Sequence, residues 1–80
     1  MKTFLFTKSP SRKRGMDMEV MAYRMKHNDP IYLGSEHYQQ RATKGAYAVA
    51  CNIIAEAGEA KLASDGYGLK AYGDTRVIEL

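Results

Sequence analysis

A turn-forming stretch between two alternating apolar runs constrains the fold of this chain more than any other feature. Residues Ser9 to Gly15 read Ser-Pro-Ser-Arg-Lys-Arg-Gly, and serine, proline and glycine favour a reversal of the chain. The flanking segments Lys2–Lys8 and Met16–Lys26 alternate apolar with polar residues. A period of two is typical of half-buried strands. The sequence therefore predicts a β-hairpin whose tip carries three consecutive cations.

The second of these runs changes its apolar phase midway. Its apolar residues form two sets of opposite parity: Met16, Met18 and Val20, then Met21, Tyr23 and Met25. A β-bulge near Val20 and Met21 would bring both sets to one face of a sheet. The segment His27–Pro30 predicts a turn because Asn and Asp bond their local backbone and proline fixes φ. A third strand is expected from Ile31 to Tyr38.

From Ala42 to Ala57 the apolar period becomes helical. The apolar stripe consists of Ala42, Ala46, Val49, Ile53 and Ala57, broadened by Ala50 and Ile54. Thr43 is the expected N-cap and Gly58 suits the C-terminal cap. Ser35 followed by Glu36 is an alternative start two turns earlier, and the sequence does not decide between the two.

The C-terminal segment contains two hairpin signals, Asp65-Gly66 and Gly73-Asp74. Strands are expected over Tyr67–Tyr72 and Thr75–Leu80, whereas Glu59–Ser64 fits either a strand or a continuation of the helix. The predicted order is strand, strand, strand, helix, strand, strand. This order is typical of an α+β fold, an antiparallel β-sheet of four to five strands with one α-helix packed on one face. With 80 residues the chain is expected to form a single domain.

Composition restricts the environment and the class of protein. An apolar fraction of 45% is too high for a disordered chain. No apolar stretch approaches the roughly 20 residues that span a bilayer, and the N-terminus lacks the features of a signal peptide. Cys51 is the only cysteine, so no internal disulfide can form. These observations predict a cytoplasmic protein without a membrane partner.

The net charge of +3 conceals an asymmetry along the chain. Residues 1–44 contain nine lysines and arginines and four acidic residues, a balance of +5. Residues 45–80 contain three basic and five acidic residues, a balance of −2. A positive first half can steer a protein toward nucleic acid or an acidic protein surface.

The three cations at the predicted hairpin tip repel one another unless they remain hydrated or meet a negatively charged partner. We therefore predict a binding site at this tip, supported by further cations and one tyrosine of the same hairpin. The candidate binding residues are Arg12, Lys13, Arg14, Lys8, Tyr23, Arg24 and Lys26. Such a set contacts phosphates and not base edges, if its partner is a nucleic acid.

The chain shows no catalytic or metal-binding signature. His27 and His37 lie ten residues apart without a second cysteine, which does not fit a zinc site. Cys51 lies among apolar helical residues, and burial makes a thiol inert. We therefore expect no enzyme, no cofactor and no metal, with a Cys51 nucleophile as a low-ranked alternative.

Two resemblances follow from these segments. Ala42-Thr43-Lys44-Gly45-Ala46 resembles the start of the last helix of double-stranded RNA-binding domains, although one lysine of that family's basic pair and its N-terminal helix are missing. The whole chain resembles compact phage-encoded inhibitors, including anti-CRISPR proteins. The shared features are a basic hairpin over Phe4–Lys26, a strand from Ile31, an alanine-rich helix and a short C-terminal hairpin.

The second resemblance implies a small non-enzymatic protein, encoded by a phage or mobile element. Such a protein would inhibit a host or defence complex that handles nucleic acid, through protein contacts made by the basic hairpin, in the host cytoplasm. The alternative is an autonomous DNA- or RNA-binding protein that uses the basic hairpin and tyrosines of the chain. The sequence leaves the target and the oligomeric state open.

Overall fold

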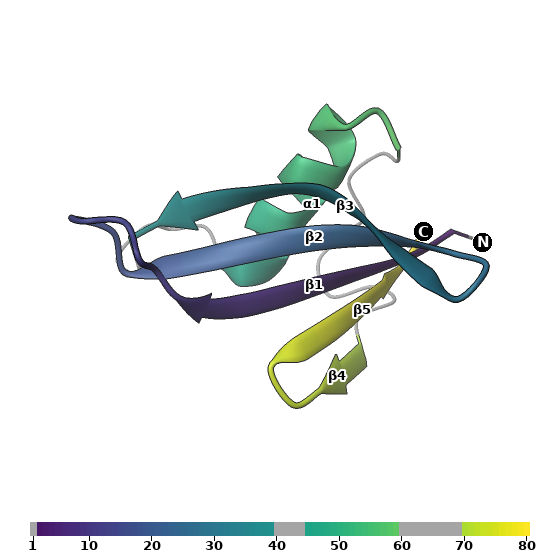
Figure 1. The fold of residues 1–80 in the computed structure, drawn as a ribbon, viewed down its shortest axis with the longest axis horizontal. Helices are drawn as coiled ribbons and strands as arrows, with labels where there is room; N and C mark the ends of the chain where they lie inside the picture. Colours follow the sequence, from purple (N-terminus) through teal and green to yellow (C-terminus); the bar gives the residue numbers. More distant parts are fainter. Residues whose placement is uncertain (1, 40–44, 60–69) are drawn as a thin grey trace.

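Five strands pair into one antiparallel sheet in the order β3-β2-β1-β5-β4, with a helix on one face (Figure 1). The computed structural model describes residues 2–39, 45–59 and 70–80. The elements are β1 (Thr3–Pro10), β2 (Met18–Lys26), β3 (Asp29–Tyr38), α1 (Ala46–Glu56), β4 (Lys70–Tyr72) and β5 (Thr75–Glu79). The predicted α+β class and element order are confirmed.

The core lies between α1 and the sheet face that the helix covers. Phe4 and Phe6 of β1 point to this face because alternate strand residues share a side. Their partners across β2 and β5 share that side as well. The buried residues are Phe4, Phe6, Val20, Ala22, Ile78, Val49, Ala50, Cys51, Ile53 and Ile54. The predicted helical seam is therefore buried at Val49, Ala50, Ile53 and Ile54.

The helix begins after Gly45, whose backbone is extended and whose position supplies no side-chain cap. The expected start at Ala42 and the expected cap Thr43 lie outside the described residues. The alternative start at Ser35 and Glu36 is wrong, because both residues belong to β3 and pair with β2.

The C-terminal end of the helix is capped by Gly58, as the sequence predicts. Gly58 has a φ of +74°, and its N–H donates to the Ala55 carbonyl over 2.9 Å. The N–H of Glu59 donates to the Ile54 carbonyl over 3.2 Å. This pair of bonds is a Schellman motif, which needs a left-handed residue at the position of Gly58.

The predicted bulge in β2 is wrong. The pairing of β1 with β2 is regular from Phe4–Arg24 to Pro10–Met18. The register shift lies between β2 and β3, next to Ala22 and Tyr23, where Leu33 has no counterpart. The change of apolar phase in β2 has a different cause, because this strand presents apolar side chains to both faces of the sheet.

The turns follow the local sequence. His27 and Asn28 both have positive φ, 53° and 65°, which is the type I′ geometry of two-residue hairpin loops. The predicted turn is therefore shorter than expected, and its last two residues open β3. Gly73-Asp74 joins β4 to β5 as predicted, with Gly73 at a φ of +60°. Three predictions fall on residues 60–69, outside the described residues. They are the Asp65-Gly66 turn, the strand or helix over Glu59–Ser64 apart from Glu59 itself, and the first three residues of the strand predicted over Tyr67–Tyr72.

The two ends of the described chain lie side by side. The N–H of Lys2 donates to the Leu80 carbonyl over 2.8 Å, and the N–H of Leu80 donates to the Lys2 carbonyl over 2.9 Å. The loop between β1 and β2 lies at the opposite end of the sheet (Figure 1). The long axis of the molecule therefore separates the chain ends from the predicted binding tip.

Candidate binding surfaces

The loop between β1 and β2 is held by its own backbone. The N–H of Ser11 donates to the Asp17 carbonyl over 2.9 Å, and the N–H of Met16 donates to the Lys13 carbonyl over 3.1 Å. The second bond closes a β-turn whose third residue, Gly15, has a φ of +86°. A type II turn requires positive φ at that position, which explains the glycine after the three cations.

Side chains anchor this loop to the end of β3. The Ser11 hydroxyl lies 2.7 Å from Nδ1 of His37 and accepts a bond from the N–H of Lys13 over 3.0 Å. Nε2 of Gln39 donates to the Gly15 carbonyl over 3.2 Å. These contacts hold the base and the turn of the loop in one backbone conformation.

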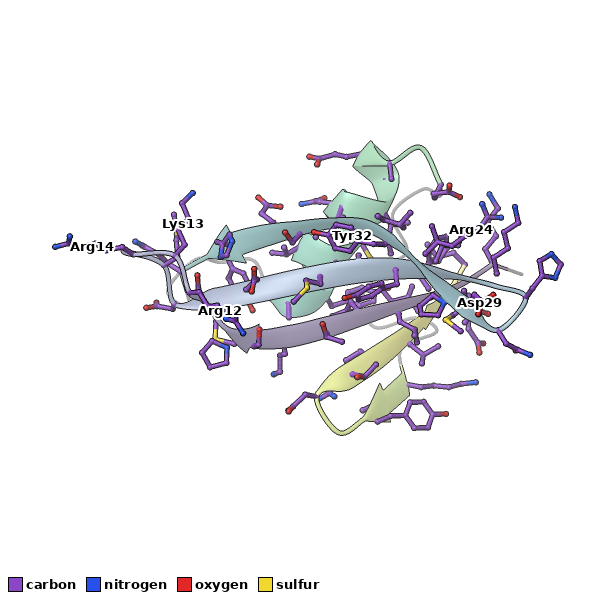
Figure 2. All side chains as sticks on the ribbon, in the orientation of Figure 1. Arg12, Lys13, Arg14, Arg24, Asp29 and Tyr32 are labelled. Atoms are coloured by element: carbon purple, nitrogen blue, oxygen red, sulfur yellow. The ribbon has the colours of Figure 1, made fainter. Side chains whose placement is uncertain are left out.

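The cations themselves point away from the anchored backbone. We call Arg12, Lys13 and Arg14 the basic tip. All three residues are exposed, and within the described ranges their side chains have no hydrogen-bond or ion-pair partner. Figure 2 shows them at the far end of the hairpin. The structure thus combines a fixed backbone with three unpaired positive charges.

The other predicted binding residues do not gather at this tip. Lys8 is exposed on β1 and shares the face of Phe4 and Phe6. Arg24 follows Met18 by six residues in β2, so at ~3.3 Å per residue it lies about 20 Å along the strand. Lys26 ends β2 beside Asp29. The predicted set therefore divides between the two ends of the sheet.

Arg24 is engaged within the fold. Its guanidinium forms an ion pair with the carboxylate of Glu59, just beyond the end of α1. The ammonium of Lys2 donates to the Glu59 carbonyl over 2.9 Å. Arg24 therefore ties β2 to the end of the helix. The sequence contains no signal for this contact, because 35 positions separate the two residues.

Tyr23 faces the opposite side of the sheet from Arg24, since successive strand residues alternate. Its ring meets that of Tyr32 on β3 at a centroid distance of 5.7 Å and an interplanar angle of 59°. Its hydroxyl donates to the sulfur of Met21 over 3.5 Å. Tyr23 therefore belongs to a surface that the sequence reading missed, on the sheet face away from α1.

We call this surface the open face, and Figure 1 looks directly onto it, with α1 behind the strands. One row of paired residues crosses all five strands: Lys70, Val77, Leu5, Tyr23 and Tyr32. Met21 and Met25 have the same parity as Tyr23 in β2 and flank this row. The apolar and aromatic members of the open face are Leu5, Met21, Tyr23, Met25, Pro30, Tyr32, Tyr72 and Val77.

Ser11, His37 and Glu19 have the residue types of a hydrolytic triad, but their contacts fit an anchor. Triads pair the hydroxyl with Nε2 and the carboxylate with Nδ1, and here the two ring nitrogens are exchanged. The 3.3 Å from His37 Nε2 to Glu19 Oε1 also exceeds the length of a strong charge-assisted bond. We therefore assign these three residues to positioning the basic tip.

We also searched the described part of the chain for a metal site, a reactive thiol and a membrane-spanning helix. Residues 2–39, 45–59 and 70–80 contain no cluster of three His, Cys, Asp or Glu side chains that could hold a metal ion. Cys51 is a free thiol and is buried. The helix described is too short and insufficiently apolar to cross a membrane.

Comparisons with known proteins give no assignment. No protein-family model, curated protein or solved structure matches this chain. Its function must therefore be inferred from the geometry of its own residues.

Proposed function

We propose that this chain is a small non-enzymatic binding protein that inhibits a nucleic-acid-handling defence complex through its basic tip. The main observation behind this proposal is the basic tip, which consists of three exposed cations on a backbone held by Ser11 and Gln39. The source would be a phage or mobile element, and the site of action the host cytoplasm, as the resemblance to anti-CRISPR proteins implies. The partner surface would be acidic.

The anchored backbone supports a binding role for the tip. A loop that is already ordered loses less conformational entropy on association than a free loop does. Unpaired charges at a projecting end also accelerate encounter with an oppositely charged surface. The contacts of Ser11 with His37 and of Gln39 with Gly15 therefore favour tight association without adding any partner contact of their own.

The distribution of cations favours a protein target over autonomous binding to nucleic acid. A phosphate track needs several available cations along one side. Here the basic tip lies at one end of the sheet, whereas Lys26 lies at the other and Arg24 is paired with Glu59. The tip is a compact, point-like positive charge, which suits an acidic pocket better than an extended backbone.

Two double variants that each remove two positive charges test the role of the basic tip. We would express the chain in a panel of bacteria with different active CRISPR systems and measure plaque formation by a targeted phage. The parent is expected to restore plaques in at least one strain. Arg12→Ala with Arg14→Ala should lose most of this effect, whereas Lys8→Ala with Lys26→Ala should keep it.

Two results would contradict the proposal. If the parent restores plaques in no strain, the inhibitor function is wrong. If both double variants lose activity equally, net charge matters and the tip does not. Titration of the parent against random-sequence DNA and RNA at rising salt tests the alternative, because phosphate binding weakens steeply with salt. Submicromolar, strongly salt-dependent binding there would favour the nucleic-acid-binding protein.

A further inference from the structure

We propose that the open face is a self-association surface on which a second copy of this chain packs, sheet against sheet. This inference does not depend on the proposed function, since it concerns a different face of the molecule. The chemistry, the charge and the area of this face favour a second copy as its occupant.

The open face has the composition of an interface. The row from Val77 through Leu5 and Tyr23 to Tyr32 is apolar and aromatic, and methionines flank it. Tyrosine and methionine are enriched at protein interfaces. Tyr32 is 55% exposed although its ring contacts Tyr23. Monomeric proteins rarely leave a contiguous apolar patch of several hundred Å² uncovered.

The ionisable side chains on this face lie in pairs. Among the described strand residues, the charged groups of the open face are two pairs near its margins, His37 with Glu19 at 3.3 Å and Lys70 with Glu79 at 3.0 Å. The Glu79 carboxylate holds the pKa of Lys70 above its usual value. Within the described strands, no cation without a partner lies on this face for phosphates. Both pairs lie near the margins, so two copies can approach each other through the apolar row between them.

The size of the face predicts a weak dimer. Five strands about 4.8 Å apart, with a typical length of about seven residues at ~3.3 Å each, give roughly 500 Å². Two copies would bury roughly 1,000 Å² in total, the lower limit for a specific interface. Sheets pack face to face at about 10 Å with strands within about 30° of one another. The product would be a helix–sheet–sheet–helix sandwich that dissociates on dilution.

Neighbouring residues of β3 provide a matched pair of variants. Tyr32 lies on the open face, whereas Ile31 pairs with Arg24 on the helix side and is 44% exposed. Sedimentation velocity of the parent over a range from low micromolar to near-millimolar concentration should show monomer passing to dimer. Tyr32→Lys should remain monomeric throughout, because each interface would bury two uncompensated ammonium groups. Ile31→Lys should dimerise like the parent.

A second variant covers the case in which Tyr32→Lys does not fold. Thr7→Lys places a charge at the centre of the open face, between Met21 and Thr75, without removing an apolar side chain. It should also be monomeric with an unchanged circular dichroism spectrum. If the parent is monomeric at every concentration, the proposal is wrong, and a different molecule would be the partner of this face. Loss of the dimer in Ile31→Lys as well would overturn it too, because that result indicates pairing through the β3 edge.

Discussion

The thiol of Cys51 lies in the core between α1 and the sheet, with 2% of the residue exposed. A buried thiol is inaccessible to reagents in solution. We expect native Cys51 to react with iodoacetamide only as fast as the protein unfolds, and rapidly in denaturant. Mass spectrometry of alkylated protein over time measures both rates. Fast native labelling would contradict the core position and would revive Cys51 as a nucleophile.

Ionisation of Tyr38 should lower the stability of the fold at alkaline pH. Burial raises its pKa above the ordinary value of 10.0, so the folded state retains the proton to higher pH than the unfolded state does. The stability from this group is fully present below about pH 10 and is lost as pH rises through the folded pKa. Urea unfolding between about pH 9 and pH 11 should show a shallower alkaline decline in Tyr38→Phe. Tyr72→Phe, at an exposed site, is the control, and an equal change in both variants would refute this assignment.

Single residues also show where sequence reading reaches its limit. Gly58 and Gly73 could be placed correctly because positive φ is a local requirement that the sequence reveals. Tyr23 and Arg24 could not, since their roles depend on which sheet face the helix covers. Arg24 points toward Glu59, and Tyr23 toward solvent and Tyr32. The alternation in β2 indicates parity but not which side is covered.

At the scale of elements, α1 approaches β3 closely at one point. A Cβ added to Gly34 would lie 3.2 Å from Cγ2 of Ile53, and Gly34 has a φ of +156°. Gly34→Ala should lower the free energy of unfolding by about 1 to 3 kcal/mol through overpacking and backbone strain. Gly45→Ala is the control, because a Cβ there meets nothing within 4 Å. Equilibrium urea denaturation compares them.

Combining Gly34→Ala with Ile53→Ala separates the effect of overpacking from the effect of backbone strain. Ile53→Ala should itself cost about 2 to 5 kcal/mol as a core truncation, and in the double variant the clash with Gly34→Ala is removed. The double variant should then lose less than the two single losses together. Strict additivity would indicate that backbone strain alone makes Gly34 necessary.

The elements themselves were largely predictable. Alternation identified β1 and β2, the turn after β2 indicated where β3 begins, and the 3.6-residue period identified α1. The bulge was misplaced because one strand bearing apolar residues on both faces gives the same pattern as one strand with a register shift. The anchor between Ser11 and His37 was missed because residues 26 positions apart meet only after β2 and β3 have paired.

At the scale of the whole molecule, the basic tip supplies all of the net charge. Replacing Arg12, Lys13 and Arg14 by alanine changes the formal charge from +3 to zero. The thermal midpoint should be unchanged or slightly raised, because exposed charges contribute little and their mutual repulsion disappears. Solubility should fall near neutral pH. Calorimetry and a precipitation series measure the two effects.

Ser11→Ala provides the contrast, since it keeps every charge but removes the anchor to His37. It should lower stability by about 1 kcal/mol, the usual contribution of one hydrogen bond. A triple variant that unfolds would show that the tip supports the fold and does not serve binding alone.

The hydrogen bonds that join Lys2 to Leu80 have a practical consequence. Both ends of the described chain lie at one pole, and the basic tip lies at the other (Figure 1). A surface linker or a fluorescent label attached at either end would leave the tip pointing outward into solution. A short peptide could also join the two ends and allow new ones to be opened at the His27-Asn28 turn. Immobilised in this way, every molecule would present its basic tip to the solution in the same orientation.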